Sequence, residues 1–312
     1  MNILVTGGAG YIGTTLVPLL LDEGHHVTVL DTLRFGIGPI LPWFRQPRFS
    51  FARVDIRDRP ALAAHAREAE AFVHLAAMVG YPACARAPAE AQTINVEGSG
   101  NVAAVAGRDR PVLLASTGSC YGDVGGAVCT EDTPLRPLSL YGQTKAQAET
   151  LILSQCNAVV YRMATVYGVS PRLRLDLLVN DFVYRALHEH RLTVYEGHHR
   201  RSFLHVHDVA RAMLLALDHF AEMSGRVLNV GDEIQNCTKL DVCRVIQQVV
   251  PGVTVEAAAT GRDLDRRDYA VSYARIKALG FHSTVSLADG VRELAQVVPW
   301  IERREQFSNV SP

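Results

Sequence analysis

The amino-acid sequence predicts an α/β protein with a doubly wound parallel sheet. Three observations lead to this prediction. Short apolar runs alternate with helix-like segments through the first half of the chain, a glycine-rich turn follows the first run, and an aspartate follows the second. Strand–helix alternation of this kind produces a parallel sheet with helices on both faces, because each helix returns the chain to the same edge of the sheet.

The elements are predicted in order along the chain. The apolar runs that we interpret as strands are 3–5, 27–30, 49–54, 71–75, 112–115 and 158–162. The helices between them are expected at 14–23, 61–70, 89–107 and 141–155. Gly24 ends the first helix, as glycine commonly does.

Beyond about Tyr167 the alternation loosens. Helices are predicted at 175–190, 205–220 and 240–250, the second of them capped by Asp208, and a strand at 227–230 is expected to return to the main sheet. No repeat or low-complexity linker separates the two halves. We therefore predict a larger domain at 1–166, with 203–232 returning to it, and a smaller, interleaved C-terminal domain at 167–202 and 233–312.

Composition excludes several classes of function. The formal net charge of -1 gives no general affinity for nucleic acid or an anionic membrane. The six cysteines form no CxxC pair and no His/Cys cluster has the spacing of a zinc site, so we expect no metal. We expect no secretory leader at the start of the chain, and no apolar run in the sequence is long enough to span a bilayer. The expectation is a cytoplasmic protein with free thiols.

The glycine-rich turn is the first sign of a ligand. Gly7, Gly10 and Gly13 lie between the first predicted strand and the first predicted helix. Glycines in this context permit a tight turn, let the backbone approach a pyrophosphate, and allow the helix to pack closely on the strand. The helix N-terminus then presents N–H groups to the phosphates. The larger domain is therefore expected to be a Rossmann-type dinucleotide-binding domain.

Asp31 indicates which dinucleotide is bound. A carboxylate at the end of the second strand can accept hydrogen bonds from both ribose hydroxyls and repels a 2′-phosphate, which favours NAD over NADP. Arg34 lies close enough in sequence to keep NADP open. Asp55 and Ile56, after the third strand, are expected to flank the adenine, although Asp55 has the alternative of a simple turn residue.

Tyr141 and Lys145 are the candidate catalytic pair. They lie four residues apart, on one face if the segment is helical. A nearby ammonium and a positive nicotinamide should lower the pKa of the phenol, so that it can accept an alcohol proton. Thr117, just past the strand at 112–115, can hydrogen-bond the reacting hydroxyl. The alternative for Thr117 and Ser119 is that they only satisfy the backbone of their loop.

At this point the sequence resembles the extended short-chain dehydrogenase/reductase family of nucleotide-sugar epimerases and dehydratases. The matching segments span nearly the whole chain and are Thr6 to Gly13, Asp31, Asp55-Ile56, His74 to Ala77, Asn95-Val96, Thr117 with Tyr121-Gly122, Tyr141 with Lys145, Arg162 with Val166 to Gly168, and Arg201 to Ala210. The resemblance implies bound NAD, a catalytic set of Thr117, Tyr141 and Lys145, a nucleotide-diphosphate sugar as substrate, and a homodimer.

The resemblance also implies the residues that hold each ligand. The positions facing NAD are Gly7, Gly10, Tyr11, Ile12, Gly13, Asp31, Asp55, Ile56, Leu75, Ala76, Ala77, Tyr141 and Lys145. The positions facing the substrate are Met78, Ser119, Tyr141, Asn180, Arg201 and Arg267. Arg201 and Arg267 would pair with the diphosphate, unless they form surface salt bridges. Arg172 and Arg174 are weaker candidates, and Thr165 departs from the asparagine that many 4-epimerases place on the phosphate.

Two positions in the catalytic loop favour one reaction over others. Family members that remove water across C5–C6 or decarboxylate a glucuronate carry a glutamate just after the catalytic threonine, whereas this chain has Gly118 and Ser119. The 4-epimerases use small, neutral residues there. Segments 170–182 and 265–269 are closest in pattern to a subgroup acting on nucleotide-activated heptoses.

The sequence therefore predicts an NAD-dependent nucleotide-sugar 4-epimerase with a transient 4-keto intermediate and a heptose as the candidate sugar. A 4-dehydrogenase that releases the keto sugar remains open, since it needs the same catalytic set. A 4,6-dehydratase and a non-catalytic NAD sensor are weaker alternatives. A possible metal site is suggested by the residue types at His205, His207 and Asp208. We expect instead that Asp208 caps its helix and that the two histidines pack beneath it.

Overall fold

The structure is a computed structural model that describes residues 1–258, 268–301 and 307–309. Within these residues the main sheet has seven parallel strands in the order β3-β2-β1-β4-β5-β7-β11. The chain winds outward from β1 in one direction through β2 and β3, and in the other from β4 onward, which confirms the predicted doubly wound fold. The strands are β1 (Asn2–Thr6), β2 (His26–Asp31), β3 (Phe49–Arg53), β4 (Ala71–His74), β5 (Val112–Thr117), β7 (Ala158–Met163) and β11 (Val227–Val230).

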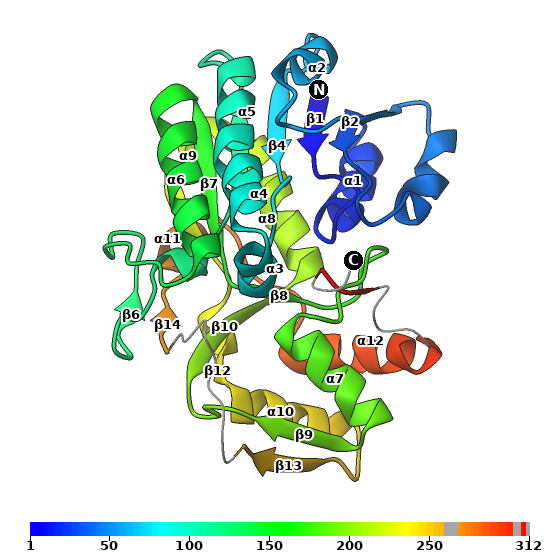
Figure 1. The fold of residues 1–312 in the computed structure, drawn as a ribbon, viewed down its shortest axis with the longest axis vertical. Coiled ribbons are helices and arrows are strands. Elements are labelled where there is room, and N and C mark those ends of the chain that lie inside the picture. Colours follow the sequence, from blue (N-terminus) through cyan, green and yellow to red (C-terminus); the bar gives the residue numbers. More distant parts are fainter. Residues whose placement is uncertain (259–267, 302–306, 310–312) are drawn as a thin grey trace.

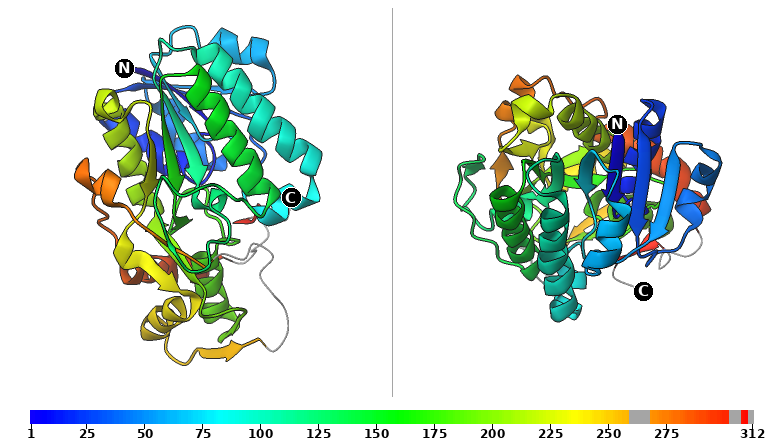
Figure 2. Two further views of the ribbon diagram at one scale, coloured as in Figure 1. Left: turned by 90° about the vertical axis from the view of Figure 1, so that its left-hand side faces the viewer. Right: turned by 90° about the horizontal axis from the view of Figure 1, so that it is seen from above.

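Helices cover both faces of this sheet (Figure 2). The strands bury side chains on both sides: Ile3 and Val5 of β1 join one core, and Leu4 between them joins the other. One face carries α1 (Gly13–Asp22), α8 (Val206–Asp218), α9 (Phe220–Met223) and α11 (Ala274–Ala278), and the other carries α2 (Arg59–His65), α5 (Ser99–Ala106) and α6 (Leu140–Gln155).

A smaller lobe lies below the carboxyl ends of the sheet strands (Figure 1). Its own core includes Tyr167, Phe203 and Val183. Its elements are β8 (Thr165–Tyr167), β10 (Arg200–His205) and β12 (Asn236–Thr238) in one sheet, β9 (Arg191–Val194) and β13 (Thr254–Ala257) in another, and the helices α7 (Leu178–His188), α10 (Lys239–Val249) and α12 (Leu287–Val297). In the described chain no helix is both long and apolar enough to cross a membrane.

The remaining elements are short and were not anticipated. They are η1 (Gly38–Arg45), α3 (Tyr81–Arg86), η3 (Gly118–Cys120), η4 (Glu233–Gln235), η5 (Val298–Trp300), and the paired strands β6 (Val128–Cys129) and β14 (Ala270–Val271). Apart from η1, each spans only a few residues, too few for a hydrophobic period to show in the sequence.

Three elements differ from their prediction. The helix expected at 89–107 is divided into α4 (Pro88–Gln92), a π-helical turn η2 (Thr93–Gly98) and α5. The helix expected at 61–70 begins at Arg59, because Asp58 caps it by accepting a hydrogen bond from the Ala61 N–H (3.0 Å), and it ends at His65.

The helix at 206–218 is not capped by Asp208, so that prediction was wrong. His205 is its N-cap, accepting from the His207 N–H (3.3 Å). Asp208 lies within the first turn and is fully buried. Its carboxylate accepts hydrogen bonds from the chain at 284–285. Arg211 of the same helix also donates to it (2.9 Å). A buried carboxylate accepts from the donors that its surroundings provide, and here most of them belong to a distant segment.

The residues that pack into the main sheet and those that pack into the smaller lobe do not follow the domain boundaries predicted from the sequence. Strand β10 crosses position 203 and lies in the small three-stranded sheet. Tyr269, Tyr273 and Phe281 pack into a core of the main sheet, although the segment had been assigned to the smaller domain. The smaller lobe is therefore interleaved more finely than the sequence indicated.

Candidate active site

A cleft of about 880 Å³ lies between the main sheet and the smaller lobe. It is at the carboxyl ends of β1, β2, β4 and β5, the edge where open α/β sheets bind ligands. Most of the residues predicted from sequence line it together. These are Gly7, Gly10, Tyr11, Ile12, Gly13, Asp31, Asp55, Ile56, Leu75, Ala76, Ala77, Met78, Thr117, Ser119, Tyr141, Lys145 and Arg201.

The glycine-rich turn packs so closely against neighbouring backbone that two of its glycines leave no space for a side chain. Gly7 has a φ of +72°, and a Cβ there would lie 2.6 Å from the Ala76 nitrogen. A Cβ on Gly13 would lie 2.5 Å from the Gly8 Cα. Among the described residues, the backbone N–H groups of Tyr11 and Ile12 find no acceptor. The turn therefore offers free donors at the start of α1, as a pyrophosphate requires.

Asp31 ends β2 at the edge of this turn. Its carboxylate accepts hydrogen bonds from the Leu33 N–H (2.8 Å) and the Ala9 N–H (3.1 Å), and burial raises its pKa. The carboxylate lines the cleft and can accept ribose hydroxyls there. Arg34, which could have served a 2′-phosphate, is ion-paired with Glu90 (3.2 Å). Asp55 is ion-paired with Arg57 (2.6 Å).

The catalytic pair lies on the first turns of α6. Ser139 caps this helix by accepting a hydrogen bond from the Gly142 N–H (3.2 Å), which places Tyr141 and Lys145 on one face of the helix. The Tyr141 phenol lies close enough to the Thr117 side chain for Thr117 to lower its pKa, and the Thr117 hydroxyl itself donates to Ser119 (3.1 Å). The structure thus brings the three predicted catalytic residues to one point of the cleft.

The electrostatics of this pair differ from the prediction. Burial raises the pKa of the Tyr141 phenol, and its interaction with Thr117 offsets only part of this effect. Burial also lowers the pKa of Lys145 to about 8. Lys145 was expected to lower the pKa of Tyr141, but in the protein alone desolvation of the phenol is the larger effect. In the described chain, the Lys145 ammonium has no hydrogen-bond partner, so it is available to a ligand.

A second group of residues supports the site from behind, and sequence reasoning assigned it no role. Asn95, in the π-helical turn, accepts from the Met78 N–H (2.7 Å) and donates to the Met78 carbonyl (3.0 Å) and to Thr144 (3.0 Å). It thereby fixes the backbone of Met78 against α6. The match at Asn95-Val96 was the available signal, but it did not indicate what the amide contacts.

A buried ion pair lies behind the catalytic residues. Glu149 accepts from Arg162 (2.8 Å) and from Ser116, the residue before Thr117. Both charged side chains are nine-tenths buried. Glu149 lies one turn after Lys145 and raises its pKa against the effect of burial. The Glu149 carboxylate therefore helps to keep Lys145 positive.

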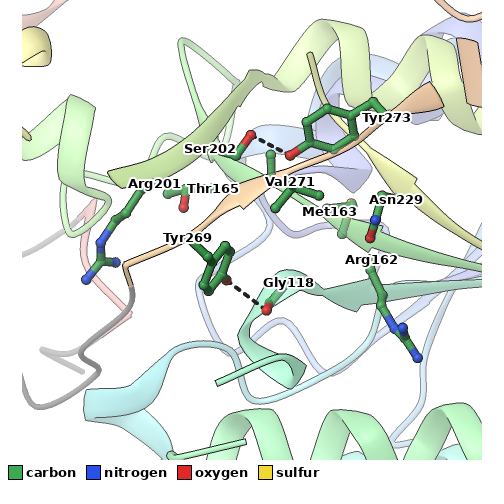
Figure 3. A pocket seen from close by; sticks show the side chains of 11 residues that line it. Gly118, Arg162, Met163, Thr165, Arg201, Ser202, Asn229, Tyr269, Val271 and Tyr273 are labelled. Carbon is green, nitrogen blue, oxygen red and sulfur yellow. Dashed lines mark hydrogen bonds between the residues drawn. The ribbon is translucent and has the colours of Figure 1, made fainter. Parts of the chain in front are cut away.

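A side pocket adjoins the cleft behind the catalytic loop, and Figure 3 shows its lining. Tyr269 donates a hydrogen bond to the carbonyl of Gly118 (2.8 Å), the residue after Thr117. The Arg201 side chain extends from β10 away from this contact and lines both spaces. A Cβ on Gly118 would lie 3.2 Å from the Tyr269 hydroxyl. The loop is therefore held on its far side by Tyr269.

The other predicted substrate residues are placed as follows. Asn180 does not line the cleft: it is fully buried, its amide accepts from the Gly168 N–H (3.0 Å), and it donates to the Arg174 carbonyl (2.8 Å). Arg267 lies outside the described residues. Arg172 and Arg174, the weaker candidates, both line the cleft. No carboxylate occupies the catalytic turn at 118–120.

Of the two histidines near Asp208, His205 is buried with a structural partner, whereas His207 is exposed, so the expectation that both pack beneath Asp208 was wrong for His207. His205 Nε2 contacts the Glu293 carboxylate at 2.7 Å. In the part of the chain that the structure describes, no group of three or more His, Cys, Asp or Glu side chains could hold a metal ion.

Taken together, these hydrogen-bond donors and acceptors fit NAD. The N–H groups of Tyr11 and Ile12 suit the pyrophosphate, the Asp31 carboxylate suits a ribose, and the Lys145 ammonium, unpartnered within the described chain, suits a second ribose. A bound nicotinamide would then lie near the hydroxyls of Thr117 and Tyr141, where an alcohol can be oxidised.

Comparison with known proteins agrees with this assignment. Residues 3–231 match the family described as the NAD dependent epimerase/dehydratase family. The chain is 31% identical to a dTDP-glucose 4,6-dehydratase of Streptomyces griseus, over 98% of this chain and 95% of that protein. It is 30% identical to UDP-glucuronic acid decarboxylase 1 of Arabidopsis thaliana, over 93% of this chain and 68% of that protein.

A solved structure extends the likeness to three dimensions. The UDP-glucuronic acid 4-epimerase of Bacillus cereus, in complex with UDP-glucuronic acid and NAD, superposes with a TM-score of 0.87. The match is 26% identical and covers 96% of this chain and 99% of that chain. These relatives catalyse different reactions, so the likeness establishes the family and its cofactor and leaves the reaction to the residues of the site.

Proposed function

This chain belongs to the NAD dependent epimerase/dehydratase family, and we propose that it is a nucleotide-sugar 4-epimerase. The observation that carries this proposal is the turn after Thr117. It contains Gly118 and Ser119, with no carboxylate, next to a complete set of Thr117, Tyr141 and Lys145. Elimination or decarboxylation at C5–C6 needs an acid or base near those carbons, whereas chemistry at C4 needs only the catalytic set.

Each residue of the catalytic set has a proposed role in the oxidation and reduction of C4. Tyr141 takes the proton of the C4 hydroxyl, and the Thr117 hydroxyl holds that oxygen by a hydrogen bond. Lys145, one turn along the same face of α6, would stabilise the phenolate electrostatically. When bound, NAD would accept the C4 hydride and return it to the other face of C4. Tyr141 later returns the proton to the C4 oxygen of the transient 4-keto sugar, once the sugar has turned about its diphosphate.

The substrate is proposed to be a nucleotide-diphosphate sugar. Arg201 and Arg174 line the cleft with guanidinium groups that suit phosphate oxygens, although Arg174 is already paired with Asp176 (2.6 Å). The segment 170–182 retains its resemblance to the nucleotide-heptose subgroup, so a heptose is our candidate sugar. We propose a homodimer on the family resemblance alone.

The product of the reaction tests this proposal. The purified protein is incubated with a panel of nucleotide hexoses and heptoses, while NADH absorbance and the configuration of the product by NMR are followed. We expect a 4-epimer and no net NADH. A released ketone with accumulating NADH would identify the 4-dehydrogenase instead, and a 6-deoxy-4-keto product would contradict the argument from Gly118 and Ser119.

Tyr141→Phe tests the assigned base. Loss of the phenolic oxygen should reduce turnover by about 100-fold or more, because general base catalysis is worth that much. NAD should remain bound, since the glycine-rich turn is unchanged. An active Tyr141→Phe protein would contradict the assignment. The matched control is Tyr184→Phe on α7, whose ring stacks on His188 away from the catalytic residues.

A further inference from the structure

A segment of the smaller lobe is fastened to the glycine-rich turn. We call residues 168–174 the strap. The Gly168 carbonyl accepts from the Tyr11 hydroxyl (2.7 Å), the Ser170 hydroxyl donates to the Tyr11 carbonyl (2.7 Å), and the Arg172 N–H donates to the Thr14 hydroxyl (3.2 Å). The strap thus lies against the start of α1, where the free N–H groups are found.

Arg172 extends from the strap into the cleft. Its guanidinium stacks on the ring of Phe35, with 4.1 Å between the Cζ atom and the ring centroid. Phe35 belongs to the loop that follows Asp31, so this contact joins the smaller lobe to the far side of the dinucleotide site. The guanidinium also donates to Asn309 (2.9 Å), near the C-terminal end of the chain.

The guanidinium is incompletely satisfied. Arg172 is only 4% exposed, yet its Nε atom is buried without an acceptor. A buried donor of a charged group that lacks a partner costs free energy. Burial and the nearby Arg174 also lower the pKa of Arg172, to about 10. Among the described residues Arg172 forms no ion pair: the nearby Asp176, which raises its pKa, is paired with Arg174 (2.6 Å). Because the group also lines the cleft, its position suits an anionic ligand.

We propose that Arg172 binds a diphosphate, and that this diphosphate is the pyrophosphate of NAD. The anchoring of the strap on Tyr11 and Thr14, and the stacking on Phe35 beyond Asp31, place the guanidinium over the dinucleotide half of the cleft. Arg172 and Phe35 thereby close the cleft over the cofactor and slow its release between turnovers. This inference requires only NAD binding, so it stands whichever sugar product forms.

Cofactor exchange tests the inference without any turnover. The wild-type protein and Arg172→Gln are loaded with radiolabelled NAD, chased with excess unlabelled NAD, and the bound label is followed over time. Arg172→Gln should release NAD about tenfold faster or more, since a hydrogen bond to a charged group is lost. Arg172→Lys should lie between the two, because it keeps the charge without the fork. Exchange at the wild-type rate in Arg172→Gln would overturn the proposal.

A second arm separates the two sources of diphosphate. Calorimetric titration of the NAD-loaded proteins with UDP or dTDP, whichever the wild type binds, should give the same affinity in Arg172→Gln. Weaker nucleotide binding with unchanged NAD exchange would assign Arg172 to the substrate and overturn the proposal. The control is Arg292→Gln, which removes an exposed guanidinium from α12 and should exchange NAD as the wild type does. Thermal unfolding confirms that each variant is folded.

Discussion

At the scale of single residues, the site contains groups that are unfavourable for folding. Lys145 is buried, carries no hydrogen bond within the described chain, and has its pKa lowered to about 8 by desolvation. Such a residue is retained for what it does to a ligand, because an apolar side chain of similar length would cost less to bury. Activity and stability therefore compete at this position.

We predict that Lys145→Met stabilises the cofactor-free protein and abolishes turnover. Methionine fills the same space without a charge to desolvate, and one unit of pKa shift corresponds to about 1.4 kcal/mol. The free energy of unfolding at pH 7, measured with urea, should rise by about 1 kcal/mol or more. A Lys145→Met protein less stable than the wild type would show that the ammonium is stabilised by its surroundings.

The free energies of unfolding of Lys145→Met and of the wild type should depend differently on pH. Lys145 titrates near pH 8 when folded and near pH 10.4 when unfolded, so between these values the unfolded chain binds more protons. The lysine's contribution to stability therefore rises with pH across that window. The stability gap between Lys145→Met and the wild type should narrow from pH 8 to pH 10. Lys277→Met is the control, because Glu233 raises the pKa of Lys277 and its removal should not stabilise the protein.

At the scale of elements, the glycine-rich turn shows how far sequence reasoning reaches. The turn, the helix that follows it and the aspartate after β2 were all predicted, because each has a local signal in glycine spacing or hydrophobic period. The strands of the smaller lobe were missed because they are only three to six residues long and are stabilised by pairing with distant segments. Arg201 was found by resemblance, whereas its strand was not.

Gly7→Ala should abolish NAD binding, whereas Gly24→Ala should not. Both glycines have a positive φ, so either alanine costs about 1 kcal/mol or more of backbone strain. At Gly7 the new Cβ also overlaps the backbone of Ala76 at 2.6 Å, whereas at Gly24 no atom lies within 4 Å. NAD affinity by calorimetry and Tm by thermal unfolding distinguish the two effects. Full NAD affinity in Gly7→Ala would show that the turn can relax.

At the scale of the whole molecule, the two lobes are joined by buried polar contacts. Asp208 of α8 accepts hydrogen bonds from the N–H groups of Thr284 and Val285 (both 3.0 Å) and from the Thr284 hydroxyl (2.7 Å). This carboxylate fixes the segment that leads into α12, and so orients the smaller lobe against the main sheet. The strap at 168–174 is the second such joint.

Asp208→Asn should destabilise the molecule by about 3 kcal/mol, because the amide nitrogen meets donors that a carboxylate had satisfied. The free energy of unfolding by urea measures this loss. Asp218→Asn, an exposed position at the end of the same helix, is the matched control and should change stability by less than about 0.5 kcal/mol. Equal stability of the two variants would mean that the joint contributes nothing.

The sequence by itself determined the doubly wound sheet and the glycine-rich turn for NAD, and it predicted the set of residues that we propose to be catalytic, because each depends on residues close together in the chain or on a period along it. Tertiary structure alone decided what distant residues do. In the structure Asp208 accepts hydrogen bonds from the segment 284–285, and buried Asn180 accepts one from the Gly168 N–H. The Arg172 guanidinium lies over the ring of Phe35. Burial and hydrogen-bond partners depend on which segments meet, and no local pattern records that.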